Sequence, residues 1–193
     1  MLSLDPRSVA LVLIDLQQGI LGYAQAPYSA DTVIANAALL AQRFRAIDAP
    51  VIRVRVGFSA GGADMIGTPT DTPAPIPAGG LPPDWLDDPL ALPGQAGDIN
   101  ILKRQWNAFY GTELDLQLRR RGIRSIVLGG LVTPFGVEST ARAGWELGYE
   151  MIFAEDLSSA PSAPLHMHSM QLILPRLGRV RSTVEVMEAL LQD

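Results

Sequence analysis

Two ionisable residues and one glycine-rich turn are placed where they could carry chemistry. Asp15 ends the apolar run SVALVLID, Lys103 ends the shorter run INILK, and the turn at 129–137 follows a third run. A carboxylate and an ammonium that meet in a cleft form an acid/base pair, because each shifts the pKa of the other. Taken singly, each feature also has a structural explanation, as a helix cap, a surface charge or an ordinary strand-to-helix turn.

Lys103 is the only lysine among the 15 Lys and Arg residues of the chain. Heavy arginine use alone could leave one lysine by chance. A lysine ammonium differs from a guanidinium, however, because it is compact and its pKa shifts readily beside a reacting carboxylate. The sequence leaves both interpretations of Lys103 open.

Strands that precede Asp15, Lys103 and the turn at 129–137 would position these three features. Helical patterns alternate with apolar runs that are typical of buried strands. The runs lie at 8–15, 51–56, 99–103, 123–130, 151–154 and around Val180. This alternation predicts a three-layer, Rossmann-like α/β fold with a parallel sheet. Such sheets bind ligands beyond the carboxyl ends of their strands, so the three features are expected to converge at one sheet edge.

Composition restricts the class of protein. The chain has 193 residues, 48% of them hydrophobic, which predicts one domain over residues 1–193. It has no cysteine, which excludes disulfides, thiolate metal sites and a cysteine nucleophile. A net charge of −5 argues against nucleic acid as a partner. No apolar run is long enough for a membrane span, and none resembles a signal peptide, so we expect a cytoplasmic protein with a small-molecule partner.

Residues 57–97 differ from the rest, since they hold eight of the 15 prolines and no Lys or Arg. Irregular segments of this length are commonly functional lids. We interpret this proline-rich segment as a lid that sets substrate choice, with a flexible linker between two domains as the alternative. Arg53 and Arg55, just before it, could offer a guanidinium to a substrate carboxylate or could simply solvate a sheet edge.

Other signals are weaker. His166 and His168 would point to different sides of a helix and so cannot share a metal, which favours structural roles. Trp106 and Phe109 follow Lys103 and could line an apolar pocket, although core packing explains them equally well. The turn at Gly129 is not a dinucleotide fingerprint, because it lacks the G-x-G-x-x-G spacing.

Four ordered stretches resemble the isochorismatase-like hydrolases. They are ALVLIDLQQGIL (10–21), KRQWNAFYGTEL (103–114), GGLVTPFGVESTARAGWELGY (129–149) and PRLGRVRSTVEVMEAL (175–190). The resemblance implies a six-stranded parallel sheet, a homodimer or homotetramer, and a site built from Asp15, Lys103 and the loop after the fourth strand. We predict a substrate pocket that includes Gln17, Trp106, Phe109 and Phe135.

The chain departs from this family at the nucleophile. Most members carry a catalytic cysteine in that loop, and the matching residue here is Gly136. The family loop also implies a non-proline cis peptide at Val132–Thr133, which would aim N–H groups at a developing oxyanion. No metal or other cofactor is expected, because the stretch VRVGFSAGGADM (54–65), where some members place a histidine ligand, contains no histidine.

Two functions follow from this departure. The first is a hydrolase that acts on a small metabolite through acid–base chemistry of Asp15 and Lys103 without a cysteine nucleophile, for example on a vinyl ether. Asp15 would then need a raised pKa, which burial favours and the nearby ammonium opposes. The second is an inactive member of the family that binds small molecules or acts as a scaffold.

Overall fold

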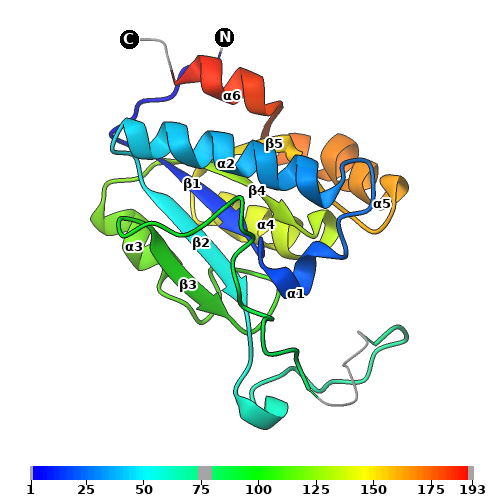
Figure 1. Ribbon diagram of the computed structural model, residues 1–193. Helices are drawn as coiled ribbons and strands as arrows, with labels where there is room; N and C mark the ends of the chain where they lie inside the picture. Colours follow the sequence, from blue (N-terminus) through cyan, green and yellow to red (C-terminus); the bar gives the residue numbers. More distant parts are fainter. Residues whose placement is uncertain (1, 74–79, 191–193) are drawn as a thin grey trace.

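Six parallel strands form one sheet in the spatial order β3-β2-β1-β4-β5-β6. They are seen in a computed structural model that describes residues 2–73 and 80–190 (Figure 1). The strands are β1 (Val9–Ile14), β2 (Val51–Val56), β3 (Ile99–Lys103), β4 (Ser125–Leu131), β5 (Glu150–Ser159) and β6 (Gly178–Arg181). The chain builds from β1 toward β3 and then, from β4, toward the opposite edge. The predicted three-layer α/β fold is confirmed, and the reversal between β1 and β4 is where such sheets bind ligands.

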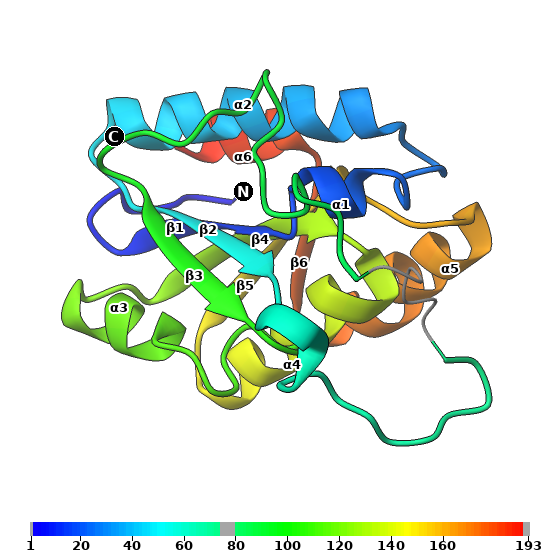
Figure 2. The same ribbon diagram turned by 60° about the horizontal axis from the view of Figure 1, so that its bottom comes forward.

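Helices cover both faces of this sheet (Figure 2). They are α1 (Gln18–Leu21), α2 (Ala30–Ala46), α3 (Leu114–Arg120), α4 (Glu138–Glu146), α5 (Ala163–His168) and α6 (Thr183–Ala189). The long helix α2 and the C-terminal α6 lie on one face, whereas α3 and α4 lie on the other (Figures 1 and 2). Within the described parts of the chain, no helix is both long and apolar enough to cross a bilayer.

Burial on two faces explains the continuous apolar run of β1, all of which is buried. Leu11 and Leu13 pack into the core on the α2 side. Val12 and Ile14 pack into the core on the α3 side. A central strand that is covered on both faces therefore has apolar residues at every position. Asp15 is the first residue beyond β1 and the first that is polar.

The strand β5 continues to Ser159, beyond the predicted end at residue 154. Leu128 pairs with Phe153, but Gly130 pairs with Ser158, so β5 carries extra residues at a register shift. Glu155 and Asp156 lie in this irregular part. The strand was predicted to end at residue 154 because these two polar residues interrupt the apolar run. The backbone nevertheless continues as a strand.

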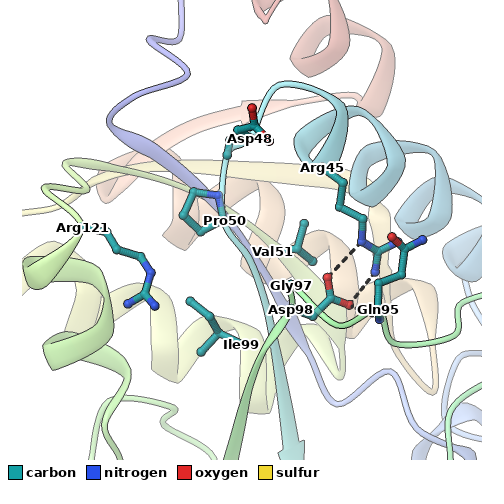
Figure 3. Close-up of a pocket in the computed structure, with 10 residues that line it drawn as sticks. Arg45, Asp48, Pro50, Val51, Gln95, Gly97, Asp98, Ile99 and Arg121 are labelled. Carbon is teal, nitrogen blue, oxygen red and sulfur yellow. Dashed lines mark hydrogen bonds and ion pairs between the residues drawn. The ribbon is translucent and has the colours of Figure 1, made fainter.

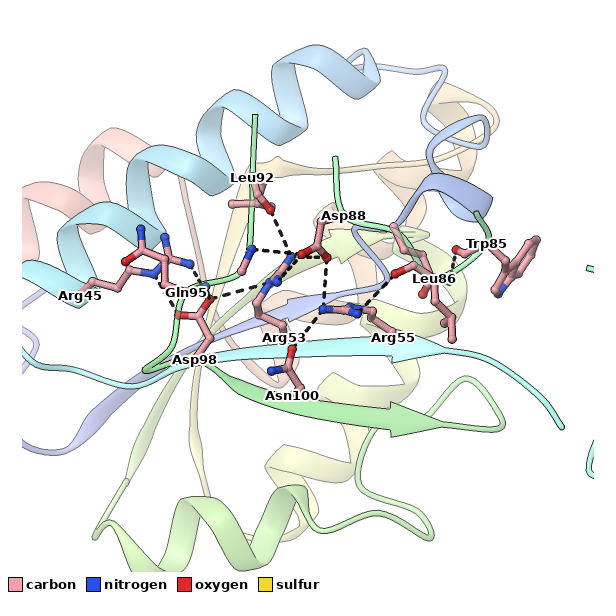
Figure 4. A network of polar contacts seen from close by, with 12 residues as sticks. Arg45, Arg53, Arg55, Trp85, Leu86, Asp88, Leu92, Gln95, Asp98 and Asn100 are labelled. Carbon is pink, nitrogen blue, oxygen red and sulfur yellow. Dashed lines mark hydrogen bonds and ion pairs between the residues drawn. The ribbon is translucent and has the colours of Figure 1, made fainter. Parts of the chain in front are cut away.

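The proline-rich segment is irregular over most of its described length. Its only helical piece there is a 3-10 turn at Ala60–Gly62. Residues 74–79, with Pro75 and Pro77, lie outside the described residues. Residues 84–98, which we call the return segment, run back over β2 toward the start of β3 (Figure 4).

Buried ion pairs fix the return segment to the sheet (Figure 4). Arg53 on β2 is only 4% exposed and donates hydrogen bonds to Asp88 Oδ2 (2.8 Å) and to the Leu92 carbonyl (3.1 Å). Asp98 accepts two hydrogen bonds from Arg45 of α2 (2.9 and 2.6 Å). Arg53 therefore anchors the chain and does not present its guanidinium to a substrate. A lid that moves as one piece over 57–97 does not fit this anchored half.

Candidate active site

The predicted acid/base pair forms at the carboxyl edge of the sheet. Asp15 directly follows β1, and Lys103 is the last residue of β3. The Lys103 ammonium donates a hydrogen bond to Asp15 Oδ2 at 2.6 Å. Asp15 is 5% exposed and Lys103 is 1% exposed. Because β2 lies between their strands, the lysine side chain must reach past the end of β2 to meet the carboxylate.

Asp15 leaves the strand through a left-handed backbone conformation, with φ of 52°. Its N–H still donates to the Val54 carbonyl (2.8 Å), so the turn begins within the ladder between β1 and β2. Aspartate is among the few residue types other than glycine that tolerate this region. The turn sends the carboxylate toward Lys103 instead of into the apolar layers.

Burial sets the protonation of Asp15. Loss of solvent raises the pKa of Asp15 to about 6, although the charge and hydrogen bond of Lys103 act in the opposite direction. Lys103 holds only Oδ2, and the buried Oδ1 has no hydrogen-bond partner among the described residues. A carboxyl group with this pKa is protonated in about half of the molecules at pH 6 and in about a tenth at pH 7. Burial therefore outweighs the ammonium, and Asp15 is protonated far more often near neutral pH than an exposed aspartic acid would be.

Gly136 lies beside this carboxylate. It belongs to a π-helical turn, Thr133–Val137, that follows β4. A Cβ atom on Gly136 would stand 3.1 Å from Asp15 Oδ2 and 2.9 Å from Ile14 Cγ2. Position 136 therefore adjoins the acid, where the family resemblance implies a nucleophile. The methyl group of Ile14 occupies part of the space that a side chain would need.

The non-proline cis peptide is Leu131–Val132, so the prediction of Val132–Thr133 is wrong by one residue. Thr133 is already the first residue of the π-helical turn, and Val132 caps it. The Val132 carbonyl accepts hydrogen bonds from Phe135 N–H (3.0 Å) and Val137 N–H (3.4 Å). The cis bond thus falls where β4 ends, before the turn begins.

Thr133 is linked to a histidine that the sequence analysis assigned only a structural role. The Thr133 hydroxyl donates to the Ser159 carbonyl (2.9 Å) and lies 2.9 Å from His166 Nδ1. A hydroxyl has one proton and the carbonyl only accepts, so His166 Nδ1–H donates to Thr133. His166 is fully buried and His168 is exposed, as expected for histidines on different sides of a helix. No sequence signal connects residues 133 and 166, since the fold alone brings α5 to this turn.

Acid pH is expected to destabilise the protein through His166. Burial lowers the pKa of His166 from 6.5 to about 4, so the unfolded chain takes up this proton first. The stabilisation that neutral His166 provides is therefore complete above pH 6.5 and is lost as pH falls toward 4. The loss in free energy of unfolding over this range is about 3 kcal/mol. The His166→Asn variant, which keeps an N–H donor for Thr133, should lack this pH-dependent loss in urea unfolding.

A comparison with His166→Asn is needed because Asp15 changes the free energy of unfolding with pH in the opposite direction. Both proteins contain Asp15, so the difference between them reports His166 alone. Between pH 3.8 and 6, Asp15 is protonated in the folded protein but ionised in the unfolded chain, because its pKa is raised only by folding. Its contribution to the free energy of unfolding is therefore present at low pH and is lost as pH rises through 6. A wild type and a His166→Asn variant with parallel stability curves from pH 7 to pH 4 would contradict the prediction.

Two of the predicted pocket residues form an aromatic pair. Trp106 and Phe135 stack with ring centroids 4.7 Å apart, and they are 60% and 38% exposed. Trp106 lies three residues after Lys103, and Phe135 directly precedes Gly136. Both remain candidates to line a substrate pocket.

The other two predicted pocket residues, Phe109 and Gln17, contact protein groups through their side chains. Phe109 stacks on Tyr149 (5.8 Å) and packs into the core on the α3 side. Gln17 is fully buried, and both polar atoms of its side chain bond to backbone groups of Val56 and Trp85. Tertiary packing thus gives both side chains partners that are distant in sequence, and their place in a substrate pocket stays a prediction.

One hollow in the described part of the protein is at the other end of the strands. This cavity of about 350 Å³ opens near the start of β2 and β3, where Arg45, Pro50, Asp98 and Arg121 contribute to its walls (Figure 3). The second one, of about 160 Å³, borders β3 beside Arg55. Neither includes Asp15 or Lys103 in its walls. Over residues 2–73 and 80–190, no three histidine, aspartate or glutamate side chains are grouped as metal ligands would be.

The protein combines two features that can be compared with known families. One is the doubly wound parallel sheet, and the other is the buried Asp–Lys pair beside the turn after β4. The family model described as "Isochorismatase domain" matches residues 9–185. The chain belongs to the isochorismatase family.

Individual relatives support this membership. YecD from Escherichia coli O157:H7, described as an uncharacterized isochorismatase family protein, is 53% identical over 190 residues, which cover 98% of this chain and 100% of YecD. A solved isochorismatase family protein from Burkholderia thailandensis is 42% identical, with a TM-score of 0.94 and full coverage of both chains. Ureidoacrylate amidohydrolase RutB from Methylorubrum extorquens is 40% identical over 74 residues, which cover 38% of this chain and 30% of RutB.

Proposed function

We propose that this protein is a hydrolase that acts on a small metabolite by acid–base chemistry of Asp15 and Lys103, without a covalent thiol intermediate. The observation that carries the proposal is the buried 2.6 Å contact between Lys103 Nζ and Asp15 Oδ2, next to a residue 136 that has no side chain. Membership of a family that includes a named amidohydrolase supports hydrolysis as the class of reaction.

A vinyl ether is the substrate type that this chemistry fits best. The free Oδ1 of protonated Asp15 would deliver its proton to the terminal carbon of the C=C–O group, which leaves an oxocarbenium ion. Water then adds to the cationic carbon, and the resulting hemiketal breaks down to a carbonyl compound and an alcohol. Lys103 holds Oδ2 throughout and stabilises the carboxylate that remains after proton transfer. Each step proceeds without a protein nucleophile, as a glycine at position 136 requires.

The second candidate is a family member that binds small molecules without converting them. The observation that favours it is the closure of the site, since Asp15 and Lys103 are buried and neither cavity described above reaches them. A protein of this kind would retain the fold and the ion pair but would turn over no substrate.

A substrate screen with two variants of Gly136 separates these candidates. The wild type is expected to cleave one or more small vinyl ethers and to leave ureido compounds and primary amides intact. Gly136→Ala places a Cβ atom 2.9 Å from the Ile14 methyl group and beside the acid, so we expect it to lower vinyl ether turnover by about tenfold. Gly136→Cys has the same steric cost and adds a thiol, so Gly136→Ala is its matched control.

The pattern of activities decides the outcome. Vinyl ether hydrolysis by the wild type, measured by release of the carbonyl product, supports acid catalysis. A wild type that is inert toward every compound, together with amide cleavage that only Gly136→Cys shows, would instead indicate loss of activity from a cysteine hydrolase.

A further inference from the structure

The side chain of Gln17 completes the sheet at the point where β1 ends. Its Oε1 accepts a hydrogen bond from Val56 N–H (2.8 Å), and its Nε2 donates to the Val56 carbonyl (3.0 Å). A neighbouring strand would offer the last residue of β2 the same pair of groups. The Gln17 carboxamide thus supplies the carbonyl and the N–H that two successive peptide groups of a longer β1 would offer.

This replacement is needed because Asp15 turns out of the strand. The register between β1 and β2 ends at Ile14 and Val54, and the left-handed conformation of Asp15 takes the following backbone away. Without Gln17, the N–H and carbonyl of the half-buried Val56 that face β1 would have lost their ladder partners, which is costly away from solvent.

Trp85 of the return segment meets the same point. Its indole N–H donates to the Val56 carbonyl (2.7 Å), and its own carbonyl accepts from Gln17 Nε2 (2.9 Å). The Gly19 N–H also donates to the Trp85 carbonyl (3.2 Å). A Cβ atom on Gly19 would lie 2.2 Å from the indole ring, so Trp85 packs directly against α1. The ion pairs of Arg53 hold the rest of this segment in place.

Gln17 therefore connects the backbone next to Asp15 with the strand that lies next to Lys103. Its backbone N–H donates to the Asp15 carbonyl (2.9 Å), which ties it to the acid. Its side chain holds Val56, which pairs with Lys103 in the register between β2 and β3. We propose that Gln17 is a positioning residue that fixes Asp15 against Lys103 by replacing the missing strand residue opposite Val56. The predicted effect on turnover rests on the proposed function, whereas the effect on the ion pair does not.

The single lysine makes this proposal measurable without a substrate. Protein labelled with ¹⁵N-lysine carries one side-chain ammonium signal, that of Lys103, and a buried ammonium held by a carboxylate exchanges slowly with water. We expect Gln17→Met to speed this exchange by about tenfold and to shift the Asp15 titration followed by ¹³C NMR. Trp85→Phe, which removes one donor to Val56 and keeps an aromatic ring, should produce a smaller change in the same direction.

Asn36→Leu is the matched control. Asn36 also uses a half-buried carboxamide to join two elements, because its Nδ2 donates to the Asp156 carbonyl (2.7 Å), but it lies on α2 away from the ion pair. We expect this variant to lower the thermal midpoint while the Lys103 signal and the Asp15 titration stay as in the wild type. If a vinyl ether substrate is found, Gln17→Met should lower kcat by about tenfold to a hundredfold with KM little changed, because Gln17 contacts backbone only.

Two results would overturn the proposal. One is a Gln17→Met protein whose Lys103 exchange and Asp15 titration match the wild type. The other is an Asn36→Leu protein that reproduces the change, which would reduce Gln17 to a contributor to general stability. A wild type without turnover would count against the proposed function alone, since the NMR measurements need no substrate.

Discussion

Replacing Asp15 by asparagine is expected to reduce turnover about a thousandfold, the scale of effect that a general acid provides. Asparagine preserves the size of the side chain and an oxygen that can accept from Lys103, but it has no acidic proton to deliver. The fold should survive, because Asp15 lies at the end of β1 and outside both apolar cores. Steady-state kinetics and circular dichroism of the purified variant test both parts.

The pH profile of the wild type gives a second measure of the same group. Because the pKa of Asp15 is raised to about 6 and the protonated form is the active one, turnover should fall as pH rises above about 6. Asp5→Asn is the control, since Asp5 pairs with Arg7 at the surface. Turnover by Asp15→Asn at the rate of the wild type would rule out acid catalysis by this residue.

Replacing Lys103 by methionine is expected to cost about 3–5 kcal/mol in free energy of unfolding at pH 8, because it leaves a carboxylate buried without its partner. The cost should be smaller at pH 5. Without the ammonium, burial alone acts on Asp15 and raises its pKa further, so the carboxyl group accepts a proton and becomes neutral. Urea unfolding at the two pH values measures the difference.

Arg7→Met provides the surface reference for this experiment. Arg7 and Asp5 form an ion pair whose side chains are 89% and 36% exposed, so its loss should change stability by no more than about 1 kcal/mol. An equal loss for Lys103→Met at pH 5 and pH 8 would show that the charge of Asp15 does not determine the cost, and that the lysine stem contributes through packing.

The fold and the core of the site could be predicted from the sequence because both follow from local patterns and one general rule. Continuous apolar runs identified the strands, and the rule that parallel strands present their carboxyl ends at one edge brought Asp15 and Lys103 together. Their separation by 88 positions along the chain did not matter, because each residue is fixed by its own strand.

The rest of the site depends on contacts that no local pattern reveals. Gln17 bonds to Val56 and Trp85, which are 39 and 68 residues away, so its role became visible only in three dimensions. Arg53 occupies a strand position that an apolar residue would normally take, and its partner Asp88 lies in a segment without regular structure. In both cases a polar side chain is buried because a distant backbone or carboxylate satisfies it, and the sequence does not show that partner.

The contact between position 136 and Ile14 has a consequence for introducing a thiol into this site. A codon change that introduces cysteine at residue 136 places the new side chain against a methyl group that already fills part of its space. A thiol at this position is therefore expected to fit well only together with a second change, to a smaller residue at Ile14 of β1. Close packing beside Asp15 thus opposes any side chain at position 136 and fits this part of the site to a glycine.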